Sequence, residues 1–479
     1  MKFAAVLMSF VAMTAFAGAE LWMPSIFGNG MVLQSGMPVP VWGEADPGAE
    51  VTVEFAGQKK TAVTSNSGKW RVTLDPLQVS SSPKELSVHS TLDTRHLSFP
   101  NVLVGEVWVL SGQSNMGIPL TKCDGGEAAA AKDYPWLHIF RQWPFQGASD
   151  APARDVTGGQ WTNGSSKQVA GLSGVGFFFA RALQAALPEG TPVALINTQM
   201  GGTYIECWID SNVLKTLPSA QPYIEKAKKE TALGKEGPGT FLGEKRFMRP
   251  SALFNGKVAP IQPFAARGVI WYQGEGNAAQ WLYAGYAESL RALINSWRDG
   301  WQRPDLPFLI VQLPRYTADR WNHWPEIRAA QAQVANRMSN VDLAVTIDCG
   351  EKDQIHPRDK EPVGERLALL ARANVYGQQV ACSGPVFQTL EISDGDAAYL
   401  TFTNSAGLIL KNGSAGFEIC GPDGKFTAAQ AEILKDGRVK VFSPEVSSPT
   451  AVRYAWFNWG EVSLFNGAGL PAAPFTTVR

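Results

Sequence analysis

The sequence predicts an α/β protein in which a mostly parallel sheet with helices on both faces is flanked by an N-terminal and a C-terminal β domain. The central prediction rests on the alternation of short apolar runs with helical stretches beyond Gly105, the pattern of βαβ units. The flanking predictions rest on short alternating runs separated by turn residues on either side of that region. With 479 residues, of which 45% are hydrophobic, the chain is too long for a single core and can fill several.

We predict four segments along the chain. They are a signal peptide at 1–19, a β-sandwich domain at 20–102, an α/β domain at 103–379 with an insertion near 209–260, and a C-terminal β domain at 380–479. The insertion breaks the strand–helix alternation and contains the charged stretch 226–235, for which we expect a helix. It is expected to shape one wall of a site.

The first twenty residues have the pattern of an export signal. Lys2 precedes an apolar run from Phe3 to Phe16, and Ala17-Gly18-Ala19 is the small-x-small pattern that signal peptidase cleaves. The apolar run is short for a membrane span, and no other stretch is long enough to cross a bilayer. We therefore expect a secreted or periplasmic protein whose mature form begins at Glu20 and does not enter a membrane.

Charge and cysteine usage exclude several classes of function. The formal net charge is -1, and no long run of one sign favours nucleic acid or an anionic membrane surface. The five cysteines are scattered without a C-x-x-C pair, so no zinc site and no catalytic thiol is expected. An oxidising compartment would allow one or two disulfides of unassigned pairing. No metal or other cofactor is predicted, and no oligomeric state follows from the sequence.

The N-terminal β prediction comes from short strand-like runs between turn signals, and we expect a packing or carbohydrate-facing accessory domain there. The runs are Val39–Trp42, Val51–Phe55 and Trp70–Leu74, with turns at Asp46-Pro47-Gly48 and Asn66-Ser67-Gly68.

The central region supplies five strand candidates and three helix candidates. The strand candidates are Val107–Leu110, Val193–Asn197, Val269–Tyr272, Phe308–Leu313 and Leu343–Ile347. The helix candidates are Phe177–Leu187, Val363–Tyr376, and the stretch in which Tyr286, Leu290, Leu293, Ile294 and Trp297 recur at helical spacing. Parallel sheets bind substrates beyond the carboxyl ends of their strands, so the loops after these runs are expected to carry the chemistry.

The C-terminal β prediction comes from a return to short strands after about Val380. The candidates are Val386–Ile392, Ala398–Thr403, Leu408–Leu410, Phe417–Cys420, Val439–Phe442 and Val452–Phe457.

Ser114 is the candidate nucleophile. It follows the apolar run Val107–Leu110, in the sequence Gly112-Gln113-Ser114-Asn115. A serine hydroxyl is a weak nucleophile that needs a base and donors for the oxyanion its attack creates. An ordinary turn is the alternative reading of a serine at a strand end, so the other loops must supply these groups.

Two further loops offer oxyanion donors. Gly201-Gly202 follows the second central strand, and paired glycines let a backbone N–H approach a ligand, although a tight turn with positive φ explains them equally. After the third strand, Asn277 can donate its amide N–H to an oxyanion. In the same loop Gln273 and Glu275, like Gln113, are expected to bind substrate or brace the loops. Trp271 and Tyr272 are more typical of packing or sugar stacking.

His356 is the candidate general base. Of the five histidines it alone follows a central strand, in Asp353-Gln354-Ile355-His356-Pro357, at the sheet edge expected for Ser114. A carboxylate three residues before it, Asp353, can accept the Nδ1 proton and leave Nε2 for the serine. For the other four histidines a structural or surface role is favoured.

These motifs resemble those of the SGNH hydrolases and, more closely, of the sialate O-acetylesterases. The resembling blocks are Phe27–Gln34, Gly112–Met116, Gly201–Trp208, Trp271–Asn277, Asp353–His356 and Ile355–Lys360, which span nearly the whole mature chain.

The resemblance implies an SGNH-like α/β fold that removes acetyl groups from hydroxyls of sialic acid without a metal. It also implies that Ser114 is the nucleophile, His356 the base and then the acid, and Asp353 the orienting carboxylate, with Asp348 as a fallback. The oxyanion donors would be the Ser114 backbone, Gly201 or Gly202, and Asn277. Gly276 stands where related sequences commonly carry serine.

Two alternatives stay open from the sequence. An acetyl xylan esterase would act on acetylated plant polysaccharide with the same apparatus, and would favour an open cleft lined by tryptophans. A sialate esterase should have a cation for the sugar carboxylate, with Arg141, Arg315 and Arg328 as candidates. A non-catalytic glycan-binding protein is the alternative from another class, and the intact Ser114, His356 and Asn277 argue against it.

Overall fold

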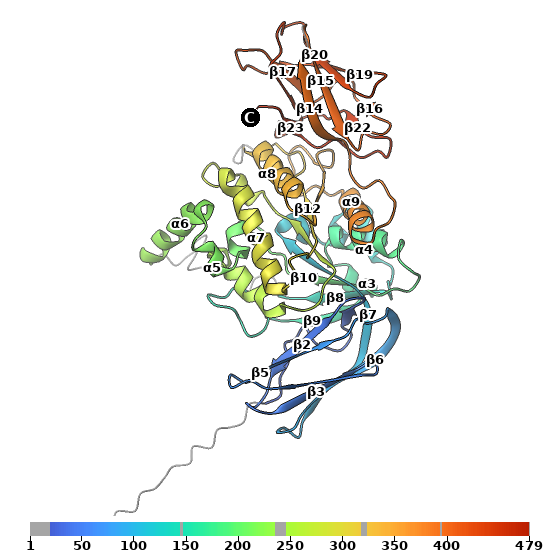
Figure 1. The fold of residues 1–479 in the computed structure, drawn as a ribbon, viewed down its shortest axis with the longest axis vertical. Helices are drawn as coiled ribbons and strands as arrows, with labels where there is room; N and C mark the ends of the chain where they lie inside the picture. The colour runs from blue at the N-terminus through green and yellow to red at the C-terminus, as the bar shows by residue number, and fades with distance from the viewer. Residues whose placement is uncertain (1–19, 144–146, 235–245, 318–322, 393–394, 479) are drawn as a thin grey trace, which may run out of the picture.

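A seven-strand path of a larger mixed sheet forms the centre of the molecule (Figure 1). The computed structural model describes residues 20–143, 147–234, 246–317, 323–392 and 395–478. The strand order is β13-β12-β11-β7-β10-β8-β9, and neighbours run parallel except β8 and β9. The bounds are β7 His96–Gly112, β8 Leu137–Arg141, β9 Gln160–Asn163, β10 Val193–Asn197, β11 Gly268–Tyr272, β12 Phe308–Val311 and β13 Val341–Ala344. The parallel strands therefore end at one edge, where Ser114 follows β7.

Helices cover both faces of this sheet, as predicted. In Figure 1, α7 and α8 pack together on one side of the sheet, and α4 and α9 on the other. The longer helices are α4 Gly174–Gln184, α6 Gln221–Ala232, α7 Tyr286–Trp301, α8 Trp324–Arg337 and α9 Glu361–Leu370, which continues into a π-helical turn at Ala371–Val375. The short helices are α1 Ser114–Gly117, α2 Gly126–Ala130, α3 Ser166–Val169 and α5 Ser211–Leu214. Strands covered on both faces are apolar along their length, and β11 is buried at every residue.

The predicted helical stripe explains how α7 packs. Its five stripe residues have no solvent exposure, and the helix ends at Gln302 in the left-handed conformation with φ 54°. Helix α4 begins at the predicted region with Ser173 as N-cap, whose hydroxyl accepts from Gly176 N at 3.0 Å.

Strand β7 joins the N-terminal β region to the central sheet. Its first half pairs with β6 and β1, and its second half pairs with β10 and β11. The predicted strand Val107–Leu110 is therefore only the end of a seventeen-residue strand, and the predicted boundary at 102–103 lies inside it. The remaining N-terminal strands are β1 Val32–Gln34, β2 Val39–Glu44, β3 Glu50–Phe55, β4 Gln58–Val63, β5 Lys69–Leu74 and β6 Ser80–Ser90.

A buried carboxylate lies at this junction. Glu106 is 4% exposed and accepts hydrogen bonds from Ser35 Oγ at 2.7 Å, Gln34 Nε2 at 3.1 Å and Tyr376 Oη at 2.8 Å. Arg267 donates to both of its oxygens, at 2.7 and 3.0 Å. The group ties the N-terminal region to the amino ends of the central strands.

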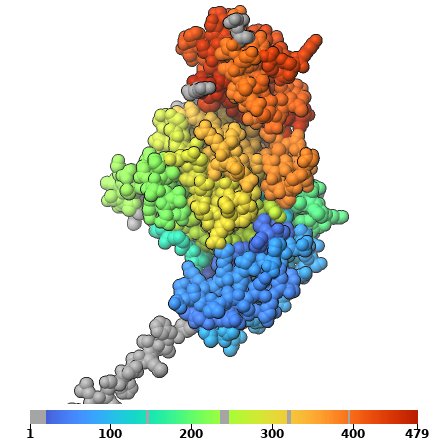
Figure 2. Space-filling view, in the orientation of Figure 1, coloured from blue at the N-terminus to red at the C-terminus, as the bar shows by residue number. Residues whose placement is uncertain are grey.

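The C-terminal β region forms separate small sheets at the end of the molecule opposite to the N-terminal β region (Figure 1 and Figure 2). Its buried residues form a second apolar core. Its strands are β14 Val386–Ile392, β15 Ala397–Thr403, β16 Ile409–Leu410, β17 Phe417–Cys420, β18 Thr427–Ala428, β19 Gln430–Ile433, β20 Val439–Phe442, β21 Ala451–Tyr454, β22 Leu464–Phe465 and β23 Phe475–Thr476. Val345 and Ile347, just after β13, are buried in this second core. Their burial explains why the predicted strand Leu343–Ile347 continues three residues past the observed end of β13 at Ala344.

Two sequence predictions are not met or lie outside the described residues, and strand β8 and helix α8 were not predicted. All five cysteines lie in the described part of the chain and are free thiols, so the expectation of one or two disulfides is not met. The predicted signal peptide, 1–19, lies outside the described residues. Among the described residues no helix is long and apolar enough to cross a membrane.

Candidate active site

The structure brings Ser114 and His356 into direct contact. His356 Nε2 and Ser114 Oγ are 2.8 Å apart, across a sequence separation of 242 residues. Both residues are half-buried. This is the distance at which an imidazole can take the proton from a serine that attacks a carbonyl group.

The turn that presents Ser114 depends on Gly112. This glycine has φ 124°, and a Cβ atom placed on it would lie 2.1 Å from the Tyr272 carbonyl oxygen. The next residue, Gln113, donates its backbone N–H to the same oxygen at 2.9 Å. Only glycine fits this approach to β11, and it allows the chain to turn into α1 with Ser114 at its first position.

The paired glycines lie beside the serine. A Cβ atom on Gly201 would be 3.4 Å from Ser114 Cβ, so this glycine keeps space open next to the hydroxyl. Gly202 has φ 71°, a conformation that favours glycine. The positive φ at Gly202 fits the turn interpretation, and the position of Gly201 beside Ser114 leaves the choice of oxyanion donor open between the two glycines.

Asn277 is fully buried and its amide is held from several directions. Its Nδ2 lies 3.2 and 3.1 Å from the two carboxylate oxygens of Glu206, and its Oδ1 accepts from Ile205 N at 2.9 Å and Gln273 Nε2 at 2.7 Å. Burial raises the pKa of Glu206 to about 7. The amide orientation is thus fixed by Glu206, which commits at least one of the two Nδ2 hydrogens; the sequence did not assign Glu206 a role.

The three residues predicted to bind substrate or brace the loops all lie in the interior. Gln113 Oε1 accepts from the backbone N–H groups of Gly274 and Gly276, at 3.5 and 3.3 Å. Gln273 donates to the Thr203 carbonyl oxygen at 3.2 Å. Glu275 is 2% exposed and accepts from Asn115 Nδ2 at 2.6 Å. Their contacts join one loop to another, which is the bracing arrangement.

Asn115 and Lys360 form a buried link between the loops of the site. Asn115 Nδ2 also donates to the Ile355 carbonyl oxygen at 2.9 Å, and the Lys360 ammonium donates to Asn115 Oδ1 at 2.7 Å. Lys360 has no solvent exposure, and burial lowers its pKa to about 8. The loops carrying Ser114, Glu275 and His356 are therefore held together by one amide. Both residues lie inside the blocks that resemble the family, Gly112–Met116 and Ile355–Lys360.

The surroundings of His356 favour its neutral imidazole. Burial, together with the nearby Lys360 cation, lowers the pKa of His356 below its ordinary value. A neutral imidazole is the form that can accept the serine proton.

The predicted carboxylates do not contact His356 among the described residues. Asp353 is exposed, and no hydrogen bond or ion pair joins it to the imidazole within the described part of the chain. The fallback residue, Asp348, forms an ion pair with Arg366 through both oxygens, at 2.6 and 2.7 Å. The Asp353 side chain lies in solvent because the backbone of this exposed turn sets its direction. The three-residue spacing from His356 does not determine that direction.

The three candidate arginines have different environments. Arg328 is fully buried and donates to the carbonyl oxygens of Ala455 and Phe457, so it anchors the C-terminal region and does not reach a substrate. Arg141 is the last residue of β8 and donates to the Gln168 carbonyl oxygen. Arg315 follows β12, donates to the Gly460 carbonyl oxygen at 3.0 Å and lies over the Trp459 ring. The last two lie at or beyond the carboxyl ends of their strands.

The described residues contain no group of three or more His, Cys, Asp or Glu side chains arranged to hold a metal ion. The arrangement can instead offer a nucleophile, a neutral base and several N–H donors.

A family model described as carbohydrate esterase, sialic acid-specific acetylesterase, matches residues 104–371. This match and the fold define the protein as a carboxylic ester hydrolase. The chain belongs to the sialic acid-specific acetylesterase family. The sialate O-acetylesterase of Mus musculus is 30% identical, over 99% of this chain and 97% of its own length. The Homo sapiens enzyme of that name is 29% identical, over 96% and 93%.

A solved structure extends the similarity to the whole fold. A carbohydrate acetylesterase from Xanthomonas citri superposes with a TM-score of 0.85 at 33% identity, covering 96% of this chain and all of that one. The predicted membership and the predicted fold class are confirmed by these comparisons.

Proposed function

We propose that this protein removes O-acetyl groups from sialic acids by transferring the acetyl group to Ser114 and hydrolysing the acyl enzyme. The observation that carries the proposal is the 2.8 Å separation of Ser114 Oγ and His356 Nε2 at the carboxyl edge of the sheet. Membership of the acetylesterase family and the names of the curated relatives support the substrate class.

The first half of the reaction transfers the acetyl group. His356 Nε2 takes the Ser114 proton while Oγ attacks the acetyl carbonyl carbon, and the carbonyl oxygen becomes an oxyanion. The backbone N–H groups of Ser114 and of Gly201 or Gly202, with the remaining Asn277 N–H, donate to it. The C–O bond to the sugar then breaks, and His356 returns the proton to the sugar oxygen.

The second half regenerates the enzyme. His356 accepts a proton from water as the water oxygen attacks the acetyl-serine carbonyl carbon. The bond to Ser114 Oγ breaks, the serine recovers its proton from His356, and acetate leaves. Since His356 has no carboxylate partner in the described residues, we propose that the pair works as a dyad.

Acetate release from O-acetylated sialic acid and from acetylated xylan, measured side by side, tests the substrate class. We expect the protein to release acetate from O-acetylated sialic acid and the Ser114→Ala variant to release none. Preference for xylan would replace the proposal with the acetyl xylan esterase alternative. Failure of a fluorophosphonate probe to label Ser114 in the folded protein would favour a non-catalytic glycan-binding protein.

The sugar carboxylate gives a second test. Arg141→Met and Arg315→Met each remove a cation at the carboxyl edge. If either binds the carboxylate, its loss should raise KM for acetylated sialic acid about tenfold or more and leave 4-nitrophenyl acetate turnover unchanged. The matched control is Arg291→Met, which removes an exposed arginine. Arg366→Met would be unsuitable because Arg366 forms an ion pair with Asp348. Unchanged KM in both variants would exclude these two arginines.

Export is part of the same proposal, because Lys2, the apolar run and Ala17-Gly18-Ala19 form a cleavable signal. N-terminal sequencing of protein recovered from the periplasm or medium should begin at Glu20. A chain that retains Met1 would contradict it.

A further inference from the structure

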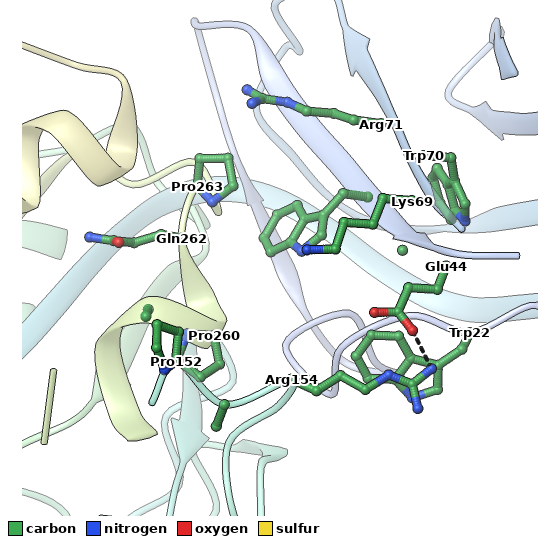
Figure 3. Close-up of a pocket in the computed structure, with 14 residues that line it drawn as sticks. Trp22, Glu44, Lys69, Trp70, Arg71, Pro152, Arg154, Pro260, Gln262 and Pro263 are labelled. Atoms are coloured by element: carbon green, nitrogen blue, oxygen red, sulfur yellow. Dashed lines mark ion pairs between the residues drawn. The ribbon is translucent and has the colours of Figure 1, made fainter. Parts of the chain in front are cut away.

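A tryptophan-lined hollow lies between the N-terminal β region and the central sheet (Figure 3). Its volume is about 610 Å³. One wall comes from β2, β5 and Trp22, and the other from Pro152 and the segment 259–263 that precedes β11. The segment 259–263 lies before the amino end of β11, whereas Ser114 lies beyond the carboxyl end of β7. The hollow, named here the tryptophan hollow, is therefore separate from the Ser114 site.

Three indole rings form the apolar part of this hollow. Trp22 and Trp42 are half-buried, and Trp42 is held edge-on by Phe27 at a centroid distance of 4.7 Å. Trp70 is 3% exposed, and its Nε1–H has no acceptor among the described residues. Rigid aromatic faces accompanied by a few polar groups are typical of pockets that bind small organic ligands, and indole faces suit the apolar faces of sugar rings.

The charges around the rings are mostly positive. Arg154 lies 3.9 Å from the Trp22 ring centroid and pairs with Glu44 at 2.7 Å. Arg71 donates to the uncharged Gln302 amide oxygen, and Figure 3 shows the exposed Lys69 side chain extending into the hollow. Three cations thus face one carboxylate, and neither Lys69 nor Arg71 has an ion pair among the described residues. This balance favours a ligand with a negative charge.

We propose that the tryptophan hollow binds an acidic sugar of a glycan chain, with its ring against Trp42 and its carboxylate near Lys69 and Arg71. This rests on the proposed function in one respect, the expectation that the acidic sugar is a sialic acid. A uronic acid has the same combination of pyranose ring and carboxylate. Because the hollow and Ser114 lie at opposite ends of the sheet, one branch of a glycan would be held while the esters of another are hydrolysed, which increases the effective concentration of substrate.

Ligand titrations monitored by saturation-transfer NMR on the full-length mature enzyme test this. The ligands are sialyllactose, a glucuronic acid-bearing xylo-oligosaccharide, and lactose as the neutral control. We expect one acidic ligand to bind at least tenfold more tightly than lactose at low salt. Trp42→Ala should weaken that binding about tenfold, and Lys69→Gln about fivefold, by loss of ring contact and charge respectively.

The controls separate the hollow from the active site. Lys84→Gln removes another exposed lysine of the N-terminal region, outside the hollow, and should leave binding unchanged. Every variant should keep kcat/KM for 4-nitrophenyl acetate, and Lys69→Gln alters only an exposed side chain, so it remains informative if Trp42→Ala does not fold. Binding that is equal for lactose, or equal in Lys69→Gln and Lys84→Gln, would overturn the proposal. Preference for the xylo-oligosaccharide would support the tryptophan hollow as a site for an acidic sugar but exclude sialic acid as its ligand. The esterase proposal is tested separately, by the acetate assay.

Discussion

Two buried glutamates at opposite ends of the central strands show how differently this protein uses buried charge. Glu106, at the amino end, accepts from Gln34, Ser35, Tyr376 and twice from Arg267. Both Glu106 oxygens accept hydrogen bonds, and the Arg267 cation balances the carboxylate charge. This is expected where a buried carboxylate serves only to hold segments together.

Glu275, at the carboxyl end, is much less well satisfied. Oε1 accepts from Asn115, but Oε2 is buried without a partner among the described residues. Burial raises the pKa of Glu275, and the same cluster includes Lys360 with a lowered pKa. The difference teaches that the amino end is built for stability, while the carboxyl end keeps unused polar capacity beside the reactive pair. Buried polar atoms without a hydrogen-bond partner are typical of functional sites.

Removing the nucleophile should produce the largest effect at the carboxyl end. Ser114→Ala is expected to lower kcat for an acetyl ester by about 10⁴-fold or more, because no other hydroxyl of the described residues is hydrogen-bonded to His356 Nε2. Acetate release measures it, and unchanged thermal unfolding serves as the control for folding. A variant that keeps most of its kcat would exclude Ser114 as nucleophile.

The amino end should respond in stability and not in chemistry. Arg267→Met leaves the buried Glu106 carboxylate without its cation, and we expect the free energy of unfolding to fall by about 3–5 kcal/mol. Urea denaturation measures the change. Lys60→Met, which breaks the exposed pair with Asp75, should cost no more than about 1 kcal/mol. Equal losses in the two variants, or a large loss of kcat in folded Arg267→Met, would break the comparison.

The Lys360 cation should influence the pH dependence of activity. Activity requires neutral His356, so it is lost as the pH falls through the His356 pKa. Lys360 helps to hold that pKa low, and Lys360→Met should therefore shift the acidic limb of kcat/KM to higher pH, with kcat reduced about tenfold by the loosened Asn115 link. Lys257→Met, at another buried lysine whose pKa is lowered by burial, is the matched control and should leave the limb in place. An unshifted limb in Lys360→Met would leave Lys360 with a packing role only.

Glu206 should make the stability depend on pH. Its pKa is about 7 in the folded protein, against an ordinary value of 4.5, so the folded protein binds a proton that the unfolded chain lacks between these values. The free energy of unfolding should therefore decrease as the pH rises through that window. Glu206→Gln should flatten this dependence in urea titrations between pH 5 and about 8. A slope identical to that of the original protein would show that Glu206 stays ionised.

Asp353→Asn should have the smallest effect. The side chain is exposed and forms no hydrogen bond or ion pair with His356 in the described part of the chain, so we expect kcat to change less than about threefold. A carboxylate that fixes the histidine tautomer contributes about 10⁴-fold in other hydrolases. A loss of that size in steady-state kcat would establish Asp353 as the third member of a triad.

The sequence by itself determined the order of the α/β and β regions along the chain. It also identified the loops after the central strands as the place of the candidate catalytic residues. Periodicity placed β10, β14, β17 and β20 at their observed bounds, because the burial of strand faces is a local pattern of residues. The rule that parallel strands end at one edge then brought Ser114 and His356 to the same place, although 242 residues separate them.

Only the tertiary structure decided where the individual side chains point. It turned Asn277 toward Glu206, left Asp353 in solvent, and placed Asn115 between Glu275 and Lys360. It also assembled the tryptophan hollow from segments that are widely separated in the sequence. The physical reason is that side-chain direction and burial depend on non-local packing and on loop backbone angles, which neither spacing nor composition specifies.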